Sequence, residues 1–148
     1  MARTPKGNDR DQIKAVVAGV GDVAVVNTYY VGLLLNSDNP KEREIAEQVG
    51  IFFPNQDDRG THINISGAGV TAAAPNKDNA IKLLEFLSSE ASQKSFAMSN
   101  YEYPLKATTE KSPLLTAWGN FKADALNLSA LGELNAEAVK TFDRAGWR

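Results

Sequence analysis

Apolar residues recur along this chain in two patterns, one typical of helices and the other of strands. Spacings of three and four residues predict amphipathic helices, while two runs that are apolar throughout and one alternating run predict strands. The predicted helices cover about residues 8–20, 28–35, 39–49, 76–87, 89–98 and 131–144, and the predicted strands cover residues 23–26, 51–53 and 61–66. Helices that alternate with strands in this way indicate an α/β fold.

Local signals mark the ends of these helices. Asn8 or Asp9 can cap the first helix, and Asn39 can cap the third, in which Pro40 takes the first helical position. Glu42 stands where a capping box places its carboxylate. The helix at residues 76–87 is expected to bury Ala80, Leu83, Leu84 and Leu87, and the last helix presents Leu131, Leu134, Ala138 and Phe142.

Two adjacent tyrosines, Tyr29 and Tyr30, stand where the first predicted strand gives way to a helix. Neighbours in a strand point to opposite faces, whereas neighbours in the first helical turn diverge by only about 100°. Asn27 or Thr28 is expected to cap that helix, whose free amide groups favour anionic oxygen. Phenolate oxygen is a hard ligand that suits ferric iron. The alternative, which is commoner from composition alone, is that both tyrosines are packing residues with hydroxyls at the surface.

The remaining residues offer less chemistry. His62 is the single histidine and lies on the polar side of the strand predicted at residues 61–66, where a solvated role is commoner than a ligand role. It can add one ligand to a mixed site, but it cannot form a multi-histidine zinc site. Gly67 and Gly69 are not followed by the lysine of a phosphate-binding loop. No nucleophile–base motif is present, so we do not expect an enzyme.

Composition narrows the class of protein. A net charge of −2 argues against a nucleic-acid partner, and the absence of cysteine excludes disulfides and thiolate metal sites. The length of 148 residues fits one domain or pieces of two lobes. No apolar run is long enough for membrane insertion, and residues 1–12 lack the apolar core of a signal peptide.

The run from Gly21 to Gly32, which holds the tyrosine pair, resembles the ligand segment of periplasmic ferric-iron-binding proteins. These are the substrate-binding components of iron ABC transporters. Residues 49–69, 79–89 and 142–147 are similar to the same family, and to its cyanobacterial members in particular. The resemblance implies the type II periplasmic-binding-protein fold, in which two α/β lobes close on Fe³⁺.

The resemblance also implies residue roles and partners. Tyr29 and Tyr30 map onto two phenolate ligands of Fe³⁺, and Asn27, with Thr28 beside it, maps onto a contact to a synergistic anion or to the ligands themselves. A periplasmic location and an ABC transporter permease as partner follow for the full-length family. The alternatives are a binding protein for another anion or small solute, or a fragment with only a structural or interaction role.

Members of the family are longer than this chain, so the resemblance implies a truncated form with a partial site. Residues 1–66 would be the second-lobe segment with the tyrosines, and residues 67–148 a crossover strand and C-terminal helices that pack on both lobes. We expect a central mixed sheet flanked by helices, within an incomplete second lobe. Apolar surface that faces the absent lobe predicts a homodimer.

Overall fold

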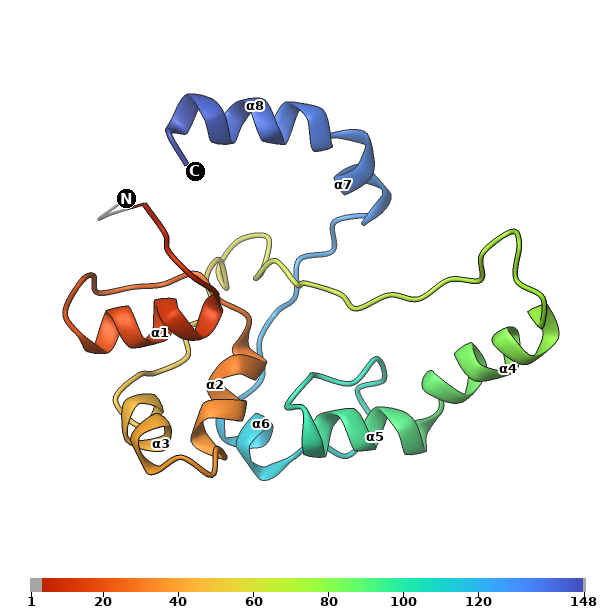
Figure 1. The fold of residues 1–148 in the computed structure, drawn as a ribbon, viewed down its shortest axis with the longest axis horizontal. Helices are drawn as coiled ribbons and strands as arrows, with labels where there is room; N and C mark the ends of the chain where they lie inside the picture. Colours follow the sequence, from red (N-terminus) through yellow and green to blue (C-terminus); the bar gives the residue numbers. More distant parts are fainter. Residues whose placement is uncertain (1–3, 148) are drawn as a thin grey trace.

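The computed structural model describes residues 4–147, and this part of the chain forms eight helices (Figure 1). Their bounds are α1 Asp9–Val17, α2 Thr28–Leu35, α3 Pro40–Ala46, α4 Lys77–Leu87, α5 Glu90–Ser99, α6 Pro113–Ala117, α7 Ser129–Glu133 and α8 Asn135–Ala145. None of these helices has the length and apolar character needed to cross a membrane.

The predicted central sheet is not seen within residues 4–147. Residues 23–26, 51–53 and 61–66 include no strand, and the β-pairing described is one parallel bridge between Thr61 and Ala123. The sequence pattern of these segments fits a strand, but a strand also needs the hydrogen-bonding groups of a neighbour. The prediction of three paired strands was therefore wrong for the described residues.

The N-terminal helices α1, α2 and α3 pack against one another and form the core. Its buried residues are one or two from each helix, and Tyr30 and Trp118 pack against them at its edge. The core residues are Ile13, Val31, Leu34 and Ala46. Figure 1 shows these three helices gathered together.

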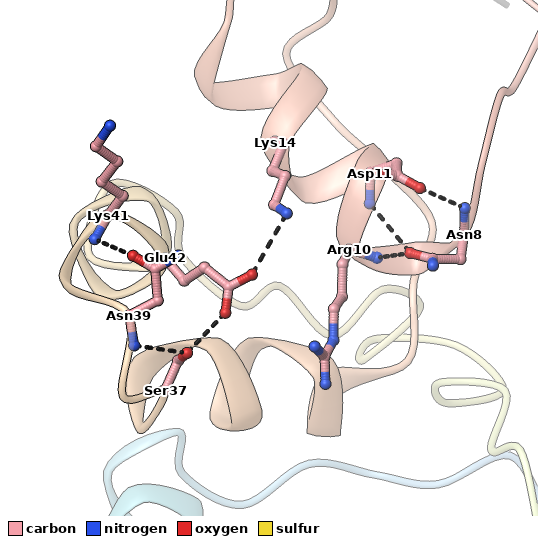
Figure 2. Close-up of polar contacts among 8 residues, drawn as sticks. All are labelled: Asn8, Arg10, Asp11, Lys14, Ser37, Asn39, Lys41 and Glu42. Carbon is pink, nitrogen blue, oxygen red and sulfur yellow. Dashed lines mark hydrogen bonds and ion pairs between the residues drawn. The ribbon is translucent and has the colours of Figure 1, made fainter.

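Helix α1 begins where its sequence predicts. The Asn8 side chain accepts hydrogen bonds from the backbone amides of Arg10 at 3.0 Å and Asp11 at 3.3 Å. The carboxylate of Asp11 in turn accepts from the Asn8 amide at 2.9 Å, which completes a capping box (Figure 2). The helix ends at Val17, before the expected end, and the chain then turns at a glycine, Gly19, with φ of 73°.

Helix α3 also begins as predicted, but one of its expected contacts is different. Asn39 caps the helix through the backbone amide two residues later, and Pro40 is its first residue. Glu42 does not close a capping box: it accepts a hydrogen bond from the Ser37 hydroxyl at 2.6 Å and lies 3.5 Å from the ammonium of Lys14 (Figure 2). Glu42 therefore connects α3 to α1 instead of stabilising its own helix end.

An aromatic cluster joins three segments that are far apart in the sequence. The rings of Phe53 and Phe121 stack with centroids 4.3 Å apart, and Tyr103 packs edge-on against both. Gln56 adds polar contacts, since its side chain accepts from the Lys122 amide at 2.7 Å and donates to the backbone oxygen of the same residue. Ring packing, side-chain hydrogen bonds and the Thr61–Ala123 bridge thus hold these segments together.

The apolar stripes of α4, α7 and α8 are left uncovered. Figure 1 shows α7 and α8 lying apart from the other helices, and α4 extending away from the core. Leu83 on α4 is 55 % exposed and Leu134, between α7 and α8, is 60 % exposed. The expected burial of Ala80, Leu83, Leu84 and Leu87 was therefore wrong: Leu83 is exposed, and the other three are only partly buried.

Candidate metal centre at the paired tyrosines

The structure places both tyrosines in the first turn of α2. Asn27 is the N-cap residue in extended conformation, Thr28 is the first helical residue, and the amide of Tyr30 donates to the Asn27 carbonyl at 3.2 Å. The helix thus begins where the sequence predicts. The Asn27 side chain makes no capping hydrogen bond to the helix, so its polar atoms are directed elsewhere.

The phenol rings of Tyr29 and Tyr30 lie side by side. Their centroids are 4.4 Å apart and the ring planes are tilted by 41°. Tyr30 also packs against the core, which fixes one member of the pair. Two oxygen donors from adjacent residues are therefore presented together from a helix start that is held by the core.

The environment of Tyr29 keeps its proton in place. A hydrogen bond with Tyr30 raises the pKa of Tyr29 to about 12, and burial and the negative charges of Asp9 and Glu102 act in the same direction. Tyr29 is therefore a neutral phenol at neutral pH. A cation that binds here must displace a proton, which a trivalent ion does most readily because of its high charge.

Two residues missed by the sequence analysis, Asp9 and Asn64, hold Asn27 from either side. Oδ1 of Asp9 accepts from the Asn27 backbone amide at 2.9 Å and from its side-chain Nδ2 at 3.3 Å. Nδ2 of Asn64 donates to Oδ1 of Asn27 at 3.0 Å. Asn27 thus connects α1, α2 and the segment at residues 61–66, and its donors are engaged by a carboxylate rather than by a free anion.

Helix α2 is also contacted closely at Gly32, by a residue that local patterns do not reveal. A Cβ atom at Gly32 would lie 2.5 Å from Cγ of Tyr101, so only glycine allows this approach. Tyr101 itself has φ of 57°, in the left-handed region that few non-glycine residues adopt. The ring of Tyr101 therefore lies directly against the backbone of the helix that carries the tyrosine pair.

His62 is exposed, and the structure describes no contact between it and the tyrosine pair. Within residues 4–147 no three histidine, aspartate or glutamate side chains gather in a way that could hold a metal ion. The candidate ligands that this part of the chain brings together are thus the two phenols, and a metal bound there needs further ligands from outside the pair.

Comparison with known proteins shows that this chain is similar to iron uptake proteins. No family model matches the chain, but it is 48 % identical over all 148 residues to iron uptake protein A1 of Synechocystis and 46 % identical to iron uptake protein A2 of the same organism. The chain is homologous to part of the ferric-iron-binding proteins. The resemblance inferred from the tyrosine segment is confirmed. The chain spans 41 % and 43 % of the lengths of these two relatives.

Solved structures of ferric-iron-binding proteins share the arrangement of the helices. The Trichodesmium protein IdiA (FutA), solved in complex with iron and citrate, superposes on the whole chain with a TM-score of 0.93 at 51 % identity. A ferric binding protein from Campylobacter jejuni gives the same score at 49 % identity, and the chain covers 47 % of each. The separation of α7 and α8 from the core is therefore part of a larger shared fold.

Proposed function

We propose that this chain binds ferric iron through the phenolate oxygens of Tyr29 and Tyr30, by reversible chelation and without catalysis. The observation that carries the proposal is the pair of phenols 4.4 Å apart at the start of α2, in a chain homologous to ferric-iron-binding proteins. On this proposal the chain acts in the periplasm as the substrate-binding component of an iron ABC transporter, with a permease as its partner.

Two phenolates are a partial set of ligands for Fe³⁺. The remaining positions would be filled by water, by a small anion such as the citrate bound by the Trichodesmium protein, or by residues of another chain. Asn27 and Thr28 are the proposed contacts to such an anion or to the ligands. An anion at Asn27 has to compete with Asp9, whose carboxylate already accepts one hydrogen bond from the backbone amide and one from the side-chain amide of Asn27. His62 is retained as a candidate for one further ligand.

The proposal also assigns parts of the chain to a two-lobed fold. We propose that residues 1–66 form the second-lobe segment and residues 67–148 the crossover segment and the helices that pack on both lobes. The segments at residues 23–26, 51–53 and 61–66 would pair in a mixed sheet when partner strands are supplied. In the first of them Val23 and Val25 are 83 % and 85 % exposed. The exposed faces of α4 and α8 would be covered in a homodimer of the isolated chain.

Titration with Fe³⁺ tests the binding proposal, because ferric tyrosinate gives a visible charge-transfer band. Fe³⁺ would be supplied as ferric nitrilotriacetate, so that iron does not hydrolyse. We expect a band in the unmodified chain, a weaker band in Tyr29→Phe and in Tyr30→Phe, and no band in the double variant. Tyr103→Phe is the matched control, since Tyr103 belongs to the aromatic cluster with Phe53 and Phe121. A band that persists in the double variant contradicts the assignment.

A second candidate is a structural or interaction role without iron. The exposed apolar side chains of α4, α7 and α8 favour it, since each of these helices presents apolar surface that another chain could cover. A folded, colourless dimer with no measurable iron affinity would select this role over the first.

A further inference from the structure

We propose that Asp9 is a positioning residue for the tyrosine pair: its carboxylate fixes the first residue before α2 and so orients both phenols toward a shared metal ion. The proposal deepens the iron-binding function proposed above and rests on it for its metal-dependent part. The arrangement of the phenols in the metal-free chain tests it separately.

The geometry is a carboxylate that grips the start of α2 from a neighbouring helix. Oδ1 of Asp9 accepts two hydrogen bonds from Asn27, one from the backbone amide at 2.9 Å and one from the side chain at 3.3 Å. Because the Asn27 side chain does not cap its own helix, Asp9 supplies the negative charge that the positive end of α2 favours. The contact therefore sets both the backbone position and the electrostatics of the helix start.

The two acidic residues in the first turn of α1 have different tasks. Asp11 closes the capping box with Asn8 and so stabilises α1 itself. Asp9, two residues earlier, reaches across to Asn27, the N-cap residue of α2. The Asn27 side chain is also held by Asn64, whose Nδ2 donates to Oδ1 of Asn27 at 3.0 Å. Asn27 thus has little freedom to turn.

A shift in the position of Asn27 would also move the phenol rings of Tyr29 and Tyr30. Tyr29 and Tyr30 lie two and three residues further on, within one helical turn, and the amide of Tyr30 bonds to the Asn27 carbonyl. A helical turn behaves as a rigid unit, so rotation at the cap moves both side chains together. Ligand partners of this kind orient the atoms that bind the metal, and their removal typically costs about 10- to 100-fold in metal affinity.

The test compares three variants of the full chain. Asp9→Ala removes both hydrogen bonds, Asp9→Asn keeps one acceptor oxygen but removes the charge, and Asp11→Asn removes an equal charge from the same helix turn without touching Asn27. Two quantities are measured: the ring chemical shifts of selectively labelled tyrosines in the metal-free chain, and the charge-transfer band with its titration midpoint for ferric nitrilotriacetate.

We expect Asp9→Ala to alter the ring shifts of Tyr29 and Tyr30, to shift the charge-transfer band, and to weaken apparent iron affinity by at least about tenfold. Asp9→Asn should change the same signals in the same direction by less, whereas Asp11→Asn should leave them as in the unmodified chain, even where its melting temperature falls. A purely structural role for Asp9 would lower the melting temperature without moving the band.

Two outcomes overturn the proposal. One is an Asp9→Ala chain whose ring shifts and band match those of the unmodified chain. The other, which decides the matter if Asp9→Ala does not fold, is an Asp9→Asn chain that cannot be distinguished from Asp11→Asn. If the unmodified chain gives no band but the ring shifts follow the expected order, the iron function fails while the positioning role of Asp9 is upheld.

Discussion

The helices at both ends of the chain carry apolar side chains, yet those of α1, α2 and α3 are covered while those of α7 and α8 are exposed. Leu34 in α2 is fully buried among α1, α2 and α3, whereas Leu134, between α7 and α8, is 60 % exposed. Apolar spacing therefore predicts that a helix forms and which face is apolar, but burial depends on a partner element. The tyrosine pair lies in the group of helices α1, α2 and α3, which bury one another's apolar side chains.

The same substitution at these two leucines should give the largest contrast. We expect Leu34→Ala to lower the free energy of unfolding by about 2–5 kcal/mol, because it leaves a cavity in the core. Leu134→Ala should change it by less than about 0.5 kcal/mol, since an exposed side chain loses few contacts on truncation. Denaturant unfolding followed by circular dichroism measures both. Equal losses would show that α7 and α8 are covered in solution.

A pair of glycines gives a sharper form of this contrast. Gly32→Ala in α2 should destabilise the chain by about 1–3 kcal/mol, since the new methyl group would overlap the ring of Tyr101. Gly132→Ala in α7 meets nothing within 4 Å and should be neutral or stabilising by up to about 1 kcal/mol, because alanine favours the helix. Melting temperatures of the two variants give the comparison, and a stabilising Gly32→Ala would contradict the close approach of Tyr101.

The parts of this fold that sequence predicts are those set by local interactions. The starts of α1 and α3 follow from Asn8 and Asn39, whose capping partners lie two or three residues away. The tyrosine pair was found in the same way, because its position in the first helical turn follows from where α2 begins. The strand predictions were wrong because a strand depends on pairing with a distant segment, and the described residues form a single bridge.

Contacts between distant residues were equally hidden from the sequence. Asp9 and Asn27 are 18 residues apart, and Asn27 and Asn64 are 37 residues apart. Glu42 had a good local partner available, yet its carboxylate goes to Ser37 and Lys14. In each case several polar partners were chemically suitable, and the tertiary arrangement of α1, α2, α3 and the segment at residues 61–66 selected among them.

The exposed C-terminal face gives a prediction about association. If α8 lies in a homodimer, Phe142→Ser should weaken the dimer by about tenfold, equivalent to about 1.4 kcal/mol, because Phe142 is a half-exposed aromatic on that face. Lys140→Ser, on the same helix, is the control and should have little effect. Sedimentation equilibrium over a range of concentrations measures both dissociation constants. A chain that stays monomeric at micromolar concentration contradicts the predicted homodimer.

The smallest expected effect lies at the tyrosine pair and is confined to high pH. The pKa of Tyr29 is raised to about 12, first by its hydrogen bond with Tyr30 and then by burial and nearby charges, while a tyrosine in the unfolded chain titrates near about 10. A group whose folded pKa is raised stabilises the fold fully below its unfolded pKa and loses that contribution as pH rises toward the folded value. Stability should thus be unaffected at neutral pH and decline between about pH 10 and 12.

Tyr29→Phe should remove this decline and also the phenolate that appears last in an alkaline absorbance titration. Tyr103→Phe is an informative comparison, because burial raises the pKa of Tyr103 without a tyrosine partner. If the two variants give the same titration curve, the hydrogen bond within the pair is not what holds the proton on Tyr29. The pair would then be two neighbouring phenols rather than one coupled unit, and iron would have to bring them together on binding.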